Sequence, residues 1–278
     1  MHKSNQRELL VKTRSWHNEF KKTSALSDLD ISAIRKQLKG RQPFSIYFNA
    51  AVEDLADGIA NRYFHLNFPD GLAMAIEFED MAIFTVIGEV EEKLLLDIAS
   101  NPRRTEFHVA DKQADHIAKT AGKRICRRAE LVYYLLEHPK HFHINDSDMR
   151  LLTPDDLLTV ESFYAKHYPQ TIFSTWMLER PFIGLFVDNK LASAGGTIVI
   201  DRSDNAANIG NFLSAPEFRG KGYSKQVLKC LINKLLDLGI NTFSLGTTAD
   251  NIPACRAYES VGFIQIEKRI ELEMTAMI

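Results

Sequence analysis

The stretch that decides the fold is residues 211–224, which read NFLSAPEFRGKGYS. Its first four residues end an apolar run typical of a strand, and a long helical pattern starts at its end. The loop between them holds two glycines and two cations: Arg219, Gly220, Lys221 and Gly222. Glycines let successive backbone N–H groups turn toward one point, and a helix N-terminus adds partial positive charge. The loop therefore suits a pyrophosphate, although many strand-to-helix turns need glycine for geometry alone.

A second segment, residues 251–263, reads NIPACRAYESVGF. It follows the loop after one expected helix, from about residue 222 to 238, and one expected strand, residues 242–245. The joint pattern Arg219-x-x-Gly222-x-Ser224 and Asn251-x-x-Ala254-x-x-x-Tyr258-x-x-x-Gly262-Phe263 resembles the GCN5-related N-acetyltransferase (GNAT) superfamily. The resemblance covers about residues 148–278. It implies an α/β (α+β) fold with a mixed, mainly antiparallel GNAT-type sheet flanked by helices.

The resemblance also implies acetyl-CoA as the acyl donor and no metal. The strand end resembles the segment whose backbone pairs with the pantetheine amides and turns an N–H toward the thioester carbonyl, where negative charge develops. That segment is Phe212, Leu213 and Ser214. The residues that match the pyrophosphate loop are Arg219, Gly220, Lys221, Gly222, Tyr223 and Ser224. Asn251 resembles the residue that hydrogen-bonds the cofactor arm or the chain beside it.

Tyr258 resembles the residue that protonates the departing CoA thiolate. A phenol with an unperturbed pKa of about 10 is a competent donor to a thiolate if its hydroxyl lies close. The alternative is an aromatic ring that packs the helix face it shares with Ala254.

The general base is where the match is weakest. Several family members have a Glu at the end of the strand before the Asn/Tyr helix, and this sequence has Gly246 there. Asp250 is close but favours a helix N-cap, and Glu217 lies in a loop turn. A base relayed through water, or one from the other domain, therefore stays open.

The acceptor side is expected in the aromatic, irregular segment between residues 163 and 179. Most of this segment favours a core, and Tyr168 and Trp176 are the candidates for contact with an amine. His138, His141 and His143 have spacings compatible with a metal, but they lie in a polar linker without a fixed scaffold. We therefore expect no metal site.

Composition limits the classes of partner. The chain has 278 residues with 34 Lys plus Arg against 36 Asp plus Glu, so its charge gives no field that would attract nucleic acid or an anionic membrane. No stretch approaches the ~18 apolar residues of a membrane span, and the N-terminal residues lack the apolar core of a signal peptide. The 3 cysteines are an odd number without CxxC spacing, which favours a reducing compartment. We expect a cytoplasmic protein that binds neither nucleic acid nor membrane.

The N-terminal half carries no motif from which chemistry follows. The polar stretch 137–148 predicts a boundary, with an N-terminal α/β domain of unknown role at 1–147 and a GNAT acetyltransferase domain at 148–278. We expect helices over the first 20 residues, from Ser27 to Gly40, and over 50–60, 89–100 and 111–120. The expected strands are 43–48, 63–68, 73–78, 83–87, 107–109 and 125–128. We expect this half to wall the acceptor site or to provide an interface, and a degenerate copy of the same fold is one form that it could take.

The function that follows is an acyl-CoA-dependent N-acyltransferase. It would transfer acetyl to a primary amine by direct attack in a ternary complex, with a small-molecule or amino-acid-like acceptor. The alternatives are a non-catalytic CoA-binding or interaction module, and an acetyltransferase for a protein N-terminus or lysine. A homodimer is one assembly compatible with this prediction.

Overall fold

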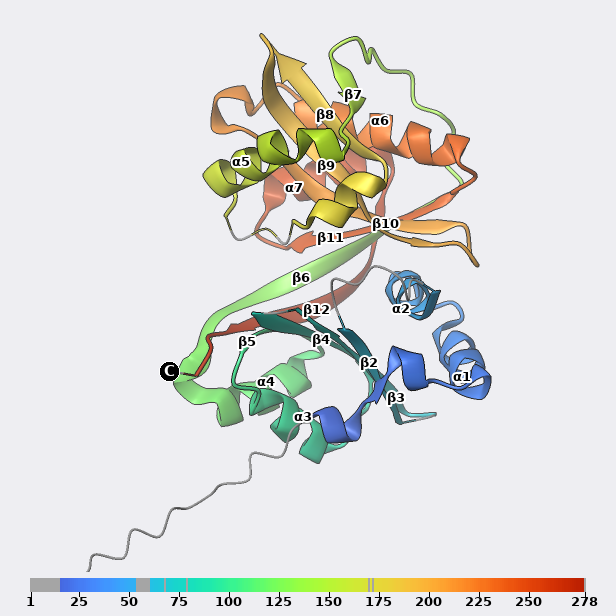
Figure 1. Cartoon of the computed structure of the whole chain (residues 1–278), viewed down its shortest axis with the longest axis vertical. Helices are drawn as coiled ribbons and strands as arrows, with labels where there is room; N and C mark the ends of the chain where they lie inside the picture. The colour runs from blue at the N-terminus through green and yellow to red at the C-terminus, as the bar shows by residue number, and fades with distance from the viewer. Residues whose placement is uncertain are drawn as a thin grey trace, which may run out of the picture. The chain divides into compact units, whose positions relative to one another are not determined.

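The computed structural model describes residues 16–53, 61–67, 69–78, 80–169, 171 and 173–277, and they form two compact units (Figure 1). Unit 1 comprises the described parts of 16–25, 61–128 and 271–277. Unit 2 comprises the described parts of 26–53 and 129–270. Two long strands, β6 (Ile125–Glu137) and β12 (Ile264–Met274), contribute residues to both units.

Unit 1 is a sheet with helices packed on it. Its strands lie in the order β1-β2-β3-β4-β5-β12, followed by the first residues of β6. They are β1 (Lys21–Lys22), β2 (Asn61–Asn67), β3 (Gly71–Glu77), β4 (Met81–Gly88) and β5 (Arg104–Val109). The helices are α3 (Glu92–Ala99) and α4 (Asp111–Ala121), with short 3-10 turns at Trp16–Glu19, Thr23–Ala25 and Gly122–Arg124. On β5, Thr105, Phe107 and Val109 are buried while the alternate residues are half-buried, so one strand face forms the core.

In unit 2 the sheet order is β12-β6-β11-β10-β9-β8-β7. The remaining strands are β7 (Met149–Leu151), β8 (Phe182–Val187), β9 (Lys190–Asp201), β10 (Ala206–Ser214) and β11 (Thr242–Thr248). The α-helices are α1 (Asp28–Leu38), α2 (Phe44–Glu53), α5 (Leu157–His167), α6 (Tyr223–Asp237) and α7 (Ile252–Val261). Short 3-10 turns lie at Pro154–Asp156, Thr175–Glu179 (η5) and Pro216–Phe218. β10 and β11 are parallel, and the other pairs in β7–β11 are antiparallel, as is the β6–β11 pair. The mixed, mainly antiparallel sheet expected from the sequence is thus observed.

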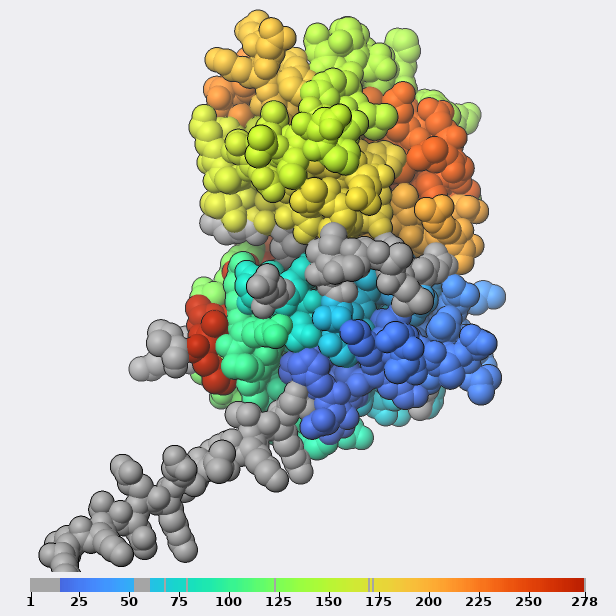
Figure 2. All heavy atoms as spheres, viewed as in Figure 1, coloured from blue at the N-terminus to red at the C-terminus, as the bar shows by residue number. Residues whose placement is uncertain are grey.

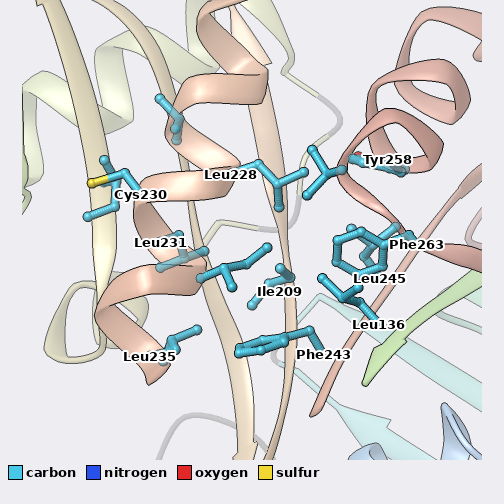
Figure 3. Close-up of a cluster of buried hydrophobic side chains, with 14 of the residues drawn as sticks. Leu136, Ile209, Leu228, Cys230, Leu231, Leu235, Phe243, Leu245, Tyr258 and Phe263 are labelled. Carbon is cyan, nitrogen blue, oxygen red and sulfur yellow. The ribbon is translucent and has the colours of Figure 1, made fainter. Parts of the chain in front are cut away.

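Each face of the unit 2 sheet has its own apolar cluster. The α6 side chains Leu228, Leu231 and Leu235 pack with Phe243 and Tyr258 on one face (Figure 3). A second cluster lies under α5 and η5, whose side chains occupy the face of unit 2 turned toward the viewer in Figure 2. This burial of both faces explains why β9 and β10 are largely apolar rather than alternating.

The order of elements along the chain occurs twice. Helices α1 and α2 precede the antiparallel strands β2, β3 and β4, then α3, β5 (parallel to β4), α4 and β6. Helices α5 and η5 likewise precede β8, β9 and β10, then α6, β11 (parallel to β10), α7 and β12. The last strand of each set is exchanged, because β6 pairs with β11 and β12 lies next to β5. The compact units therefore cross the expected boundary at 147/148, and that division of the sequence stays a prediction.

Two expectations about local structure are corrected. The run 43–48, expected as a strand, lies in α2, and the predicted extended segment 125–128 is only the start of β6. Phe44, Ser45, Ile46 and Phe48 are all buried, so successive side chains are covered on several sides of the helix. A short apolar run of this kind has no period that separates a buried helix from a buried strand.

The other expected elements are present, with boundaries that differ by a few residues. Helix α1 begins with a capping box, in which the Asp30 backbone N–H donates to Ser27 Oγ at 3.2 Å. Parts of the expected helices at the N-terminus and at 50–60 lie outside the described residues. Among the described helices, none has the length and apolar composition needed to cross a bilayer.

Candidate active site

The candidate site is built on a split between the parallel strands β10 and β11. They pair from Ala206↔Thr242 to Asn208↔Ser244, and the pairing then stops although both strands continue. Beyond the split β10 keeps its pairing with β9. The second half of β10 therefore has one edge that does not pair with β11, and its backbone groups there are available to an extended ligand.

A β-bulge sets which backbone groups face that edge. The register shifts between Gly210 and Leu213, and Asn211 adopts φ 57°, a left-handed conformation. The Tyr164 hydroxyl, from α5, donates to the Asn211 carbonyl at 2.6 Å, while Thr171 Oγ1 donates to Asn211 Oδ1 at 3.1 Å. Burial raises the pKa of Tyr164 well above its ordinary value, so this hydroxyl remains a donor.

Phe212, Leu213 and Ser214 follow the bulge and have different roles. The Leu213 carbonyl accepts from Ser193 Oγ at 2.9 Å, so its backbone groups face β9. Because alternate residues of an antiparallel strand point to opposite edges, the backbone groups of Phe212 and Ser214 face the split. Of the three residues expected beside the pantetheine arm, these two have the suitable orientation.

The glycine loop joins this edge to α6. Gly220 and Gly222 have φ of 76° and 77°, separated by Lys221 with negative φ, so successive N–H groups form a concave nest. Gly222 is the N-cap residue of α6, whose first N–H groups add to the nest, and residues 219–222 are exposed. Arg219 Nε lies 3.3 Å from the Ser214 carbonyl, and Lys221 Nζ lies 5.3 Å from the Phe218 ring centroid. Tyr223 and Ser224 begin the helix, half-buried. The loop therefore has the geometry and charge that hold a pyrophosphate.

Tyr258 lies on α7 with 7% of its surface exposed. Its ring is in edge contact with Tyr134 and Phe212, at centroid distances of 5.8 and 6.4 Å. Burial, and to a smaller extent the neighbouring Cys255 and Tyr168, raise the pKa of Tyr258 well above its ordinary value. The hydroxyl makes no hydrogen bond to another of the described residues. Tyr258 is thus a protonated phenol beside the bulge.

Asn251 is the N-cap of α7, with its Oδ1 accepting from the Ala254 N–H at 3.4 Å. Its Nδ2 donates to Thr247 Oγ1 at 3.1 Å, which ties the start of α7 to the end of β11. The cap role that the sequence favours for Asp250 therefore belongs to Asn251. Asp250 is exposed at the preceding position.

The two acceptor candidates lie in different environments. Tyr168 follows the last residue of α5 with 47% of its surface exposed, and it lies close enough to Tyr258 to contribute to the raised pKa of that phenol. Trp176, on η5, is half-buried under the Arg180 guanidinium, 4.4 Å from the ring centroid. The Trp176 Nε1–H is buried without a hydrogen-bond partner among the described residues. Of the two candidates, Tyr168 is the more exposed.

The strand-end position at which a general base is sought holds no carboxylate, because residue 246 is Gly. Gly246 is exposed on β11, and a Cβ built on it would lie 3.3 Å from the Tyr133 ring. Glu217 is exposed, and its own backbone hydrogen bond is the largest cause of a lowered pKa. Among the described carboxylates, Glu259 accepts from the Tyr134 hydroxyl at 3.2 Å on the exposed side of α7.

The histidines of the 137–148 stretch do not gather. His141 is exposed and pairs with Asp237 at 2.9 Å. Within the described ranges, the grouping with metal-ligand spacing is Glu106, His108 and Glu271 in unit 1, whose ligand atoms lie within 4.8 Å of one another. In this group Glu106 Oε1 lies 2.7 Å from His108 Nε2, and Arg127 donates to Glu271.

Comparison with known proteins shows which family the residues of this site match. A model of the acetyltransferase (GNAT) family matches residues 149–263, which contain the split, the glycine loop and Tyr258. Residues 149–263 belong to the GNAT family. A [ribosomal protein bS18]-alanine N-acetyltransferase of Haemophilus ducreyi is 38% identical over 82 residues, which are 30% of this chain. The chain spans 54% of the length of that curated relative.

Solved structures extend the likeness of fold beyond the GNAT segment. A Drosophila protein aligns over 92% of this chain and 98% of its own, with a TM-score of 0.69 and 11% identity. A GCN5-related N-acetyltransferase-like protein from Streptococcus suis aligns over 87% and 98%, with a TM-score of 0.62 and 15% identity. A tandem GNAT protein from the clavulanic acid biosynthesis pathway aligns over 92% and 97%, with a TM-score of 0.58 and 12% identity. These identities support a shared fold and no more.

Proposed function

We propose that this protein transfers the acetyl group of acetyl-CoA to a primary amine by direct attack in a ternary complex. The observation that carries the proposal is the split between β10 and β11, continuous with the Gly220–Gly222 loop at the N-terminus of α6. An extended arm fits the unpaired edge, and a pyrophosphate fits the nest. The GNAT match over the same residues supports acetyl-CoA as the donor.

The residues that bind the donor act mainly through their backbone. Phe212 and Ser214 offer N–H and C=O groups to the pantetheine amides, and an N–H at this edge would stabilise the thioester oxygen as it gains charge. The loop N–H groups, with Arg219 and Lys221, neutralise the pyrophosphate. Asn251 contributes by fixing the start of α7 against β11.

The reaction forms one bond and breaks one. The neutral amine nitrogen attacks the thioester carbonyl carbon, the C–S bond breaks with its electron pair on sulfur, and Tyr258 gives its proton to the thiolate. The proton lost by the amine leaves through water, because no described carboxylate occupies the place of the missing strand-end Glu. The raised pKa of Tyr258 keeps the hydroxyl protonated until sulfur gains charge.

Two classes of acceptor compete. A small or amino-acid-like amine is the first, with Tyr168 beside its path. The relative from Haemophilus ducreyi, which is named for action on a ribosomal protein, favours a protein N-terminal amine as the second. A peptide acceptor needs backbone contacts that a free amine does not, so the two classes differ in how the rate depends on acceptor length.

The first set of elements is proposed to be a copy of the fold that does not bind acyl-CoA. Strands β4 and β5 stay paired from Met81↔Arg104 to Thr85↔His108, without an early split. Its loop is residues 89–91, shorter than residues 215–222, and Glu91 is the N-cap of α3. A carboxylate there would repel a pyrophosphate. We retain the cytoplasmic location and the homodimer as predictions.

The test is calorimetry with acetyl-CoA on the full chain, followed by thiol release with a panel of free amines and N-terminal peptides. Binding at one molecule per chain with amine-dependent thiol release is the expected result. Binding without thiol release from any acceptor would favour a CoA-binding module. The absence of binding would overturn the proposal.

A further inference from the structure

The split between β10 and β11 begins at a buried polar junction. The residues of this junction lie outside the sequence motifs. Asn208 occupies the last paired position, opposite Ser244, and the two residues are 1% and 0% exposed. Asn208 Nδ2 donates to the Ser244 carbonyl at 3.1 Å and contacts Ser244 Oγ at 3.0 Å. The Tyr47 hydroxyl donates to Asn208 Oδ1 at 2.7 Å.

This junction has a direct effect on the ladder. In a continuous parallel ladder, the Ser244 carbonyl would accept from a backbone N–H of β10. The Ser244 carbonyl also accepts from the side-chain amide of Asn208, at the position where the two strands begin to part. Asn208 therefore braces the last rung of the ladder with its own amide, at the point where pairing ends.

Tyr47 decides which way the amide points. An Asn amide has a donor end and an acceptor end, and only a donor end directed at Ser244 can bond its carbonyl. The hydroxyl of Tyr47 donates to the acceptor end, which fixes that orientation. Tyr47 lies on α2, more than 150 residues before Asn208 in the chain, and Phe44 on the same helix packs edge-on against Tyr133 of β6, with ring centroids 5.2 Å apart.

We infer that Tyr47 and Asn208 are positioning residues, which fix the split between β10 and β11 so that the edge of β10 can receive the acyl-pantetheine arm. The inference rests on the proposed function. It assigns to helix α2 of the N-terminal half a defined part in donor binding, although α2 carries none of the GNAT motif residues.

A ligand that contains the pantetheine arm and one that lacks it distinguish this positioning role from a general loss of stability. The arm depends on the split, whereas the nucleotide end depends on the glycine loop. Tyr47→Phe, which removes one hydroxyl, should weaken acetyl-CoA binding about five- to tenfold, as expected for one misplaced hydrogen bond. Affinity for adenosine 3′-phosphate 5′-diphosphate, the nucleotide without the arm, should stay within about twofold of the wild type.

Asn49→Leu is the matched control. Asn49 lies on the same helix, and its Nδ2 donates to buried Asp201 at 2.9 Å, at the opposite end of the β10–β11 rungs. This variant removes the Asn49–Asp201 bond and keeps Tyr47 and Asn208, so it should lower the unfolding temperature and leave both affinities near wild type. Asn208→Ala, checked for folding by circular dichroism, should reproduce the selective loss of acetyl-CoA affinity.

The outcomes are distinct. Equal losses for both ligands in Tyr47→Phe, no loss at all, or the same loss in Asn49→Leu would overturn the positioning role while the proposed function stands. A wild-type protein that binds neither acetyl-CoA nor the nucleotide would remove the proposed function, and the positioning role with it.

Discussion

The ring of Tyr258 packs edge-on against the ring of Phe212, with centroids 6.4 Å apart and planes at 64°. This contact joins α7 to the residue that follows the β-bulge, so the phenol and the edge of β10 are held in one relationship. Phe212 in turn lies over Gly195, where a Cβ would approach the ring to 2.2 Å. The position of the Tyr258 ring thus depends, through Phe212, on a glycine of β9.

Tyr258→Phe should lower kcat about 100-fold or more while the dissociation constant of acetyl-CoA changes little. The reason is that the variant keeps the ring packing and removes only the proton donor. Steady-state kinetics with calorimetry would measure both. Tyr134→Phe, which removes the hydroxyl of the adjacent ring, is the control and should keep its turnover. Unchanged kcat in Tyr258→Phe would exclude the phenol from the reaction.

Gly222→Ala should raise the dissociation constant of acetyl-CoA at least tenfold. An Ala at φ 77° is strained by about 1 kcal/mol, so the loop would move its N–H groups away from the nest. Gly239→Ala is a matched control, because Gly239 has φ 84° just beyond the other end of α6, and an added Cβ meets nothing within 4 Å at either position. Both variants should lose similar stability in thermal unfolding. Equal affinities in the two variants would contradict the nest.

The pH dependence of turnover follows from the raised pKa of Tyr258. Since burial keeps the phenol protonated beyond its ordinary pKa of about 10, its ionisation should cause no fall in kcat between pH 7 and 10. Any change of kcat with pH in that interval reports the deprotonation of the acceptor amine. Its midpoint should move with the pKa of the amine used. A limb that stays fixed across amines, and disappears in Tyr258→Phe, would show that the phenol titrates in this range.

The Arg150–Asp156 pair gives a prediction for stability. Two hydrogen bonds from Arg150, at 2.6 and 2.8 Å, lower the pKa of Asp156 to about 2. A lowered pKa stabilises the folded state above the unfolded value near 4, and the contribution disappears as the pH falls toward 2. Asp156→Asn should therefore cost about 1 kcal/mol at pH 7, since Arg150 is half exposed, and nothing near pH 2.

Urea unfolding at several pH values would measure this difference. The exposed neighbour Asp155 supplies the control, and Asp155→Asn should have little effect at any pH. A cost for Asp156→Asn that is independent of pH would mean that the ion pair contributes nothing and that only the capping bond to Thr153 counts.

The sequence predicted most of the C-terminal fold because its local signals agree with one another. Gly222 and Gly262, which the sequence places at the start and end of helices, both adopt left-handed φ. The glycine loop and the Asn/Tyr helix could be found for the same reason, since each depends on neighbours within a few residues. Their assignment to a cofactor came from the family resemblance.

The remaining parts of the candidate site depend on contacts that are distant in sequence. The bulge at Asn211 is stabilised by Tyr164, and the junction at Asn208 is completed by Tyr47. The residue type at 211 is a local signal for the bulge, because Asn tolerates the left-handed φ observed there better than most residues. The first half of α2, up to residue 48, was predicted as a strand because its burial comes from packing that no local pattern encodes.

The exchange of β6 and β12 has a consequence for any attempt to produce the halves separately. A recombinant fragment that starts at residue 148 would lack β6 and so uncover the full edge of β11, from Thr242 to Thr248, beside the apolar residues Phe243 and Leu245. An uncovered apolar edge recruits strands from other molecules, so such a fragment should precipitate or form intertwined oligomers. Limited proteolysis within 138–148 should, by contrast, leave two pieces that remain associated through β6 and β12.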